Sequence, residues 1–108
     1  MQKSKAETYI GFCIRAGKLT CGFNAVRLQK KDVYLLLLCD SASENAKKDA
    51  WKLKKKFGCE LLTSVDKTLE EITGKPNCKL AAVRDKELAK AILLNKNDNF
   101  ITYIGGNG

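Results

Sequence analysis

The residues of this chain that could do chemistry are concentrated between positions 15 and 27. A short segment with apolar residues separates Gly17 from Gly22, and a helix is predicted to begin directly after Gly22. The start of a helix presents unpaired backbone N–H groups and the positive end of the helix dipole. Arg15, Lys18 and Arg27 add positive charge close to that start. This combination is typical of a site that binds a phosphate or a base edge, rather than one that makes or breaks bonds.

A second basic segment, residues 75–79, carries a lysine at each end of a Pro-Asn-Cys loop. Loops that emerge at one edge of a layered α/β domain become neighbours, so this segment and the first could share one face. Lys47 and Lys48 form a third basic group within a predicted helix. A charged helical stripe of that kind is more often a solvated face, so we give it little weight.

The sequence does not indicate an enzyme. It contains no histidine, and no cysteine has an activating partner nearby in sequence. Asp40 follows a predicted central strand, where α/β enzymes often place functional residues, but a turn that leads to a Ser43 helix cap explains it more simply. Gly17 and Gly22 lack the third glycine of a dinucleotide-binding fingerprint. We therefore expect no catalytic activity, no cofactor and no bound metal.

Composition points to a polyanionic partner. The 108 residues are enough for one domain with a modest core, and the apolar fraction of 44% is ordinary for a globular protein. Twenty basic residues against twelve acidic ones give a net charge of +8. Each phosphate neutralised by Lys or Arg releases condensed counterions, so this excess favours nucleic acid.

The cysteines indicate a reducing compartment, and the hydropathy indicates a protein that does not cross a membrane. The five cysteines form no C-x-x-C pair, and we interpret them as reduced, structural thiols. The first residues lack the apolar core of a signal peptide, and the apolar run 33–39 is too short to cross a bilayer. These features predict a cytoplasmic protein with no membrane partner, and we expect a monomer.

Apolar periodicity and turn residues predict alternating helices and strands. The predicted helices cover 4–16, 22–30, 43–57, a segment around Leu69 and Ile72 that ends at Gly74, and a segment after Asp85. The predicted strands cover 19–21, 33–39, 59–63 and 79–83. This order predicts an α/β fold, a three-layer α-β-α sandwich in which the run 33–39 is a central strand covered on both faces.

The character of the sequence changes after residue 94. Asn, Asp and Gly dominate residues 95–108, with a few apolar residues embedded among them. We therefore predict a domain over 1–94 and a C-terminal tail over 95–108, partly disordered, which either adds a strand or stays mobile.

Several ordered motifs resemble one known family. They are Ala16-Gly17-Lys18-Leu19, Gly22 with a helix behind it, the strand 33–39, Asp40-Ala42-Ser43-Asn45, and Val83-Asp85-Lys86-Ala89-Lys90-Ala91. Over residues 7–94 the chain is similar to the kink-turn-binding ribosomal proteins of the L-seven-Ae/L-thirty-e superfamily. Within that group it looks most like the small bacterial YlxQ branch of RNA-binding proteins.

The resemblance implies an α-β-α sandwich with a mixed four-stranded sheet that recognises sharply bent RNA. Members contact tandem G·A pairs and the adjacent backbone with the start of the second helix and a loop before the last strand. By position, the implied RNA contacts are Gly22, Phe23, Asn24, Arg27 and Leu28, together with Lys75, Pro76, Asn77, Cys78 and Lys79. Charge and proximity add Arg15 and Lys18.

The chain departs from the family pattern at two positions. Strong kink-turn binders read Gly-x-Asn-Glu at the helix start, with a lysine three residues further on, whereas this chain has Ala25 and Leu28 there. A carboxylate that accepts from a guanine edge discriminates between bases, and alanine cannot do so. Two hypotheses follow. The first is a non-enzymatic ribosomal or ribosome-associated protein that binds structured RNA and contacts ribosomal proteins. The second is a protein-interaction module that has lost specific RNA recognition.

Overall fold

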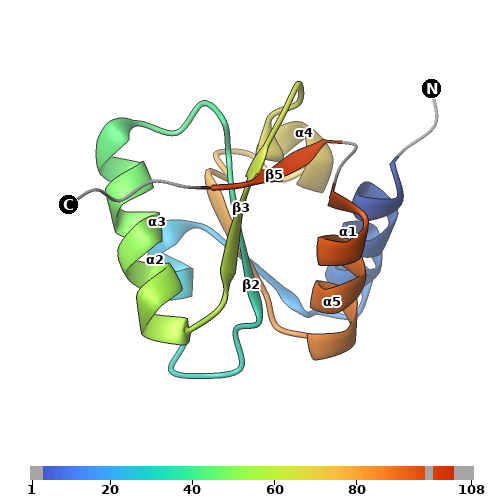
Figure 1. Ribbon diagram of the computed structural model, residues 1–108, viewed down its shortest axis with the longest axis horizontal. Helices are drawn as coiled ribbons and strands as arrows, with labels where there is room; N and C mark the ends of the chain where they lie inside the picture. The colour runs from blue at the N-terminus through green and yellow to red at the C-terminus, as the bar shows by residue number, and fades with distance from the viewer. Residues whose placement is uncertain (1–3, 97–98, 104–108) are drawn as a thin grey trace.

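The computed structural model describes residues 4–96 and 99–103, and within this part of the chain five helices alternate with five strands (Figure 1). The helices are α1 (Lys5–Arg15), α2 (Phe23–Arg27), α3 (Glu44–Phe57), α4 (Leu69–Thr73) and α5 (Lys86–Leu94). The strands are β1 (Leu19–Cys21), β2 (Leu35–Leu38), β3 (Glu60–Ser64), β4 (Leu80–Val83) and β5 (Phe100–Thr102).

The strands form one mixed sheet in the order β1-β4-β2-β3-β5. Only β2 and β3 run parallel, and the remaining pairs are antiparallel. The parallel pair is joined by α3, as a parallel connection requires a crossover element. In the antiparallel pairs on either side of β4, Val83 lies opposite both Leu19 and Leu35.

Helices cover both faces of this sheet, which confirms the predicted α/β class. One core cluster joins the sheet to α1, α4 and α5, and a second joins it to α2 and α3. Figure 1 shows the two helical layers on opposite sides of the strands. Along β2, Leu35 and Leu37 enter the first cluster while Leu36 and Leu38 enter the second, and none of the four is exposed. A strand buried on both faces requires a continuous apolar run.

The predicted number of four strands is wrong, because residues after position 94 supply a fifth. β5 pairs with the free edge of β3, with Phe100 opposite Ser64 and Thr102 opposite Leu62. The side chain of Phe100 is 1% exposed and belongs to the first core cluster. Burial of this large aromatic ring stabilises the added strand. The end of the predicted tail, residues 104–108, lies outside the described residues.

Helix α2 is also shorter than predicted, since it ends at Arg27 rather than near position 30. Val26 is its only buried side chain, so a further turn would have little core to cover. Helix α4 is capped by Thr68, which forms a capping box with Glu71. The other element boundaries agree with the sequence prediction within one to three residues.

The carboxylate of Glu7 links the two ends of the described chain. It accepts hydrogen bonds from Asn99 Nδ2 at 3.0 Å, Lys67 Nζ at 3.1 Å and the Ser4 N–H at 3.3 Å. Burial by itself raises the pKa of Glu7, but the hydrogen bonds from Lys67 and Ser4 outweigh burial and lower it overall. The ionised form of Glu7 is therefore stabilised in the folded protein.

We predict that β5 is an integral part of the folded domain. Phe100→Ala should lower the free energy of unfolding by about 3–5 kcal/mol, because it removes a buried aromatic ring and leaves a cavity. Ile101→Ala on the same strand should change it by less than about 0.5 kcal/mol, since Ile101 is 57% exposed. Urea unfolding monitored by Trp51 fluorescence measures both. Equal effects of the two substitutions would contradict an ordered β5.

Glu7 should also contribute to acid sensitivity. Its folded-state pKa is lowered, so its stabilisation is present above the ordinary glutamate pKa of about 4.3 and is lost as the pH falls through the folded value. Unfolding free energies measured between pH 6 and pH 3 should fall less steeply for Glu7→Gln than for the native protein. Glu60→Gln, at an exposed position on β3, serves as the control and should retain the native slope.

Candidate nucleic-acid interface

The junction between β1 and α2 turns at Gly22. This residue has φ 97° and ψ 145°, a backbone conformation that is essentially restricted to glycine. Its N–H donates to the carbonyl of Leu80 at 2.7 Å, which fastens the junction to the first residue of β4. Asn24 is exposed directly after the turn, while Phe23 packs against the core cluster beneath α2.

The segment 75–79 connects α4 to β4. Lys75, Pro76 and Asn77 are exposed, whereas Cys78 is 1% exposed and anchors the end of the loop in the core. Asn77 has φ 56°, and a proline followed by an asparagine in the left-handed region is the pattern of a tight turn. The loop therefore projects polar and basic groups from a fixed base.

The structure brings this loop and the β1–α2 junction together at one end of the β1–β4 pair. Strand β4 starts at the end of the loop and pairs with β1, so that Ala81 lies opposite Cys21. The Gly22–Leu80 hydrogen bond closes the corner between the two segments. The two groups of predicted contacts thus meet across this corner, with Gly22, Phe23 and Asn24 on one side and the 75–79 loop on the other.

Arg27 lies at the far end of α2 and is held by several contacts. Its guanidinium donates to Asp49 at 2.8 Å and to Asn24 at 3.2 Å, and it lies 5.5 Å from the ring centre of Phe23. The side chains of the Arg27–Asp49 pair are 47% and 41% exposed, so the ion pair itself adds little stability. Its effect is to fix the direction in which the guanidinium points.

Lys79 is likewise oriented by neighbours. Its ammonium donates to Glu70 at 3.0 Å and to the Ser41 hydroxyl at 3.1 Å, and the hydrogen bond to Glu70 raises the pKa of Lys79. The partners Asp49, Glu70 and Ser41 were not part of the sequence prediction. They come from elements distant in the chain, and no local pattern marks them.

Arg15 and Lys18 do not join this group. The Lys18 carbonyl accepts a hydrogen bond from the Arg84 N–H at 2.8 Å. Arg84 directly follows β4, whereas the corner lies at Leu80, where β4 begins. Lys18 and Gly22 are four residues apart along an extended strand, which corresponds to about 13 Å. Arg15 precedes Lys18 and lies over the ring of Phe12, 5.1 Å from its centre. Both residues therefore lie at the other end of β1.

The two positions that depart from the family pattern differ in exposure. Leu28 is 79% exposed at the end of α2, and Ala25 is partly buried. Neither side chain offers a hydrogen-bond donor or acceptor to a base. The polar side chains that this surface presents are those of Asn24, Arg27 and the 75–79 loop.

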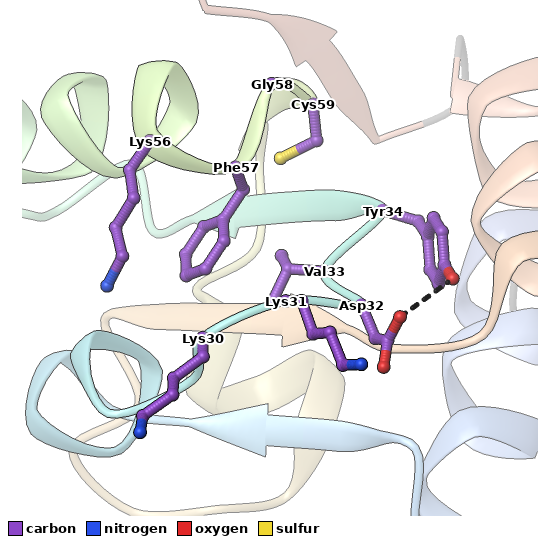
Figure 2. Close-up of a pocket in the computed structure, with 9 residues that line it drawn as sticks. All are labelled: Lys30, Lys31, Asp32, Val33, Tyr34, Lys56, Phe57, Gly58 and Cys59. Carbon is purple, nitrogen blue, oxygen red and sulfur yellow. Dashed lines mark hydrogen bonds between the residues drawn. The ribbon is translucent and has the colours of Figure 1, made fainter.

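A cavity of about 410 Å³ lies at the opposite end of β4, away from the corner. It is bounded by the segment that leads into β2 and by the end of α3, and Tyr34 on its rim donates its backbone N–H to Val83. Figure 2 shows the side chains that line it, including Lys30, Lys31 and Lys56, and the 3.3 Å hydrogen bond from Tyr34 to Asp32. None of the predicted contact residues lines this cavity.

Two further observations concern the described residues. No group of three or more His, Cys, Asp or Glu side chains is placed to hold a metal ion in residues 4–96 and 99–103. In the same part of the chain, no helix has the length and apolar character needed to cross a membrane.

Comparison with known proteins supports the fold. No protein-family model and no curated protein matches the chain. A solved structure described as a protein with unknown function, from Bacillus halodurans, superposes with a TM-score of 0.70 at 20% sequence identity. The match covers 85% of this chain and 96% of that one. At this identity the likeness establishes a shared fold.

The geometry of Gly22 generates a prediction about stability. Gly22→Ala should lower the free energy of unfolding by about 1–3 kcal/mol, because alanine is strained at this φ even though the space around the position is open. Gly11→Ala is the matched control. Gly11 lies inside α1 with ordinary helical angles and open space, so alanine should stabilise the protein by about 0.5–1 kcal/mol. Opposite signs in urea unfolding are expected, and a neutral Gly22→Ala would contradict the strained turn.

Proposed function

We propose that this protein is a non-enzymatic RNA-binding protein, ribosomal or ribosome-associated, that recognises structured, kink-turn-like RNA. The observation that carries the proposal is the corner closed by the Gly22–Leu80 hydrogen bond. It places the β1–α2 junction beside the 75–79 loop, the two segments that the family resemblance implies as RNA contacts. Sharply bent RNA presents two backbone stretches at an angle, so it could contact both segments at once.

The charges at this corner support an RNA ligand. Lys75 is exposed, and the Arg27 side chain is 47% exposed while the direction of its guanidinium is fixed by Asp49. A preoriented guanidinium binds phosphate oxygens with two parallel hydrogen bonds at a reduced entropic cost. The net charge of +8 adds a long-range attraction for a polyanion.

The mode of recognition follows from what the corner lacks. Ala25 and Leu28 supply no polar group for a base edge, so little base readout is available from the exposed side of α2. Backbone N–H groups, Asn24 and the basic side chains remain for contacts with phosphates and sugars. We therefore infer that this protein recognises the shape of the RNA backbone more than its base sequence.

The alternative, a protein-interaction module, receives less support from the surface. Ala25 and Leu28, together with apolar residues at Phe23 and in the C-terminal tail, motivate this alternative. Phe23 packs against the core and Phe100 is 1% exposed. Leu28 and Ile101 remain exposed, but they lie at opposite edges of the sheet, since α2 contacts β1 and β4 while β5 pairs with β3. These two exposed residues therefore do not form one contiguous patch, whereas partner-binding patches are contiguous.

Binding of purified protein to two RNAs tests the proposal: a kink-turn hairpin and a straight duplex of the same length. The hairpin should bind more tightly between 50 and 200 mM KCl. Lys75→Ala should weaken binding and reduce the slope of log K against log salt by about one, because one phosphate contact is lost.

The control is Lys90→Ala, which removes the same charge from an exposed position on α5, in the opposite helical layer. It should leave both affinity and slope close to native values. Equal binding of bent and straight RNA, or no binding at 50 mM KCl, would overturn the proposal. A protein partner recovered from cells that survives nuclease treatment and displaces the RNA would favour the interaction module instead.

A further inference from the structure

Three of the cysteines gather at the same end of the sheet. Cys21 ends β1, Cys78 comes shortly before β4, and Cys39 directly follows β2. Because β4 lies between β1 and β2, Cys78 is flanked by the other two thiols. Cys39 and Cys78 belong to the core cluster under α1, α4 and α5, and Cys21 packs against that cluster.

Cys21 and Cys78 are the pair that the backbone holds together. The carbonyl of Leu80 accepts the N–H of Gly22 at 2.7 Å and lies 3.7 Å from the sulfur of Cys78. Cys21 immediately precedes Gly22 and lies opposite Ala81 in the register of β1 and β4. Both side chains face the same core layer, so the two sulfurs lie on the same side of one strand pair.

The interaction between the two thiols shifts their pKa values in opposite directions. Hydrogen bonding with Cys78 lowers the pKa of Cys21 against the effect of partial burial, and the charge of Lys75 lowers it further. The same interaction raises the pKa of Cys78, which remains the protonated partner. A partly exposed thiolate beside a positive charge is the form that reacts with oxidants.

The other thiols are less suited to this reaction. Burial raises the pKa of both Cys13 and Cys59 to about 11, which keeps them protonated at neutral pH. Cys59 also packs against the core cluster on the opposite face of the sheet. The sulfur of Cys39 is buried, accepts the Leu69 N–H at 3.3 Å and lies 3.2 Å from the Ser41 hydroxyl.

We propose that Cys21 and Cys78 are a redox-modification site that forms a reversible disulfide on reaction with hydrogen peroxide. The Cys21 thiolate attacks one peroxide oxygen, the O–O bond breaks, and the products are a sulfenic acid on Cys21 and a hydroxide ion. Cys78 loses its proton to solvent and attacks the Cys21 sulfur, which releases the second oxygen as hydroxide. Overall, two thiols and one peroxide give one disulfide and two water molecules.

The disulfide would join the two segments of the corner covalently. Cys21 leads into the β1–α2 junction and Cys78 ends the exposed loop that carries Lys75. The site itself is independent of the proposed RNA function, because both thiols are placed by strand pairing. Its chemistry is therefore measured on the protein alone, in the absence of RNA.

Disulfide mapping by mass spectrometry tests the proposal. Full-length protein treated with hydrogen peroxide should yield a cross-linked peptide pair containing Cys21 and Cys78, and dithiothreitol should restore the free thiols. Cys78→Ala should accumulate a sulfenic acid on Cys21 that dimedone labels, because the resolving thiol is absent. Cys21→Ala should show neither product.

Cys39→Ala and Cys59→Ala are the matched controls, and both should form the disulfide as the native protein does. Thermal unfolding of each variant verifies that it is folded before oxidation. A cross-link that maps to Cys39, or oxidation of Cys21 to sulfinic acid with no cross-link in the native protein, would overturn the proposal. Neither result would bear on RNA affinity, which the kink-turn binding experiment measures separately on reduced protein.

Discussion

The burial of β2 on both faces is the constraint on which the rest of this structure depends. Four consecutive leucines, 35–38, have no exposed surface, so helices must cover the sheet on each side. Removing these side chains from water contributes on the order of 2 kcal/mol per leucine. β4 and β3 flank β2 as its hydrogen-bonded neighbours, and β1 and β5 then occupy the two edges.

The position of β1 at one edge explains why the candidate interface lies where it does. An edge strand has one side free of partners, so the chain that leaves it can turn outward. Gly22 makes that turn and is held by the first residue of β4, which is also where the 75–79 loop ends. The pairing of β1 with β4, closed by this hydrogen bond, thus brings together two surface segments that are more than fifty residues apart in the chain.

The same corner combines three properties. It carries exposed basic groups, Arg27 and Lys79 side chains oriented by Asp49, Ser41 and Glu70, and a thiol, that of Cys21, whose pKa is lowered by hydrogen bonding with Cys78 and by the charge of Lys75. The proposed RNA interface uses the first two properties, and the proposed redox site uses the third. Both depend on the register between β1 and β4, which places Cys21 opposite Ala81.

Much of the fold was encoded locally and could be predicted from the sequence. The unbroken apolar run predicted a strand buried on both faces, and Ser43, Gly58 and Gly74 marked helix ends through capping groups or left-handed backbone.

Non-local contacts decided the rest of the structure. Phe100 drew the C-terminal segment onto the edge of β3, and limited burial ended α2 at Arg27. Strand pairing moved Arg15 and Lys18 to the far end of β1 and brought Cys21 toward Cys78. Capping and periodicity act over a few residues, so the sequence by itself determined the elements and the candidate loops. Pairing at a sheet edge depends on which surfaces remain unfilled after the core has formed, so only the tertiary structure decided which of those residues share a site.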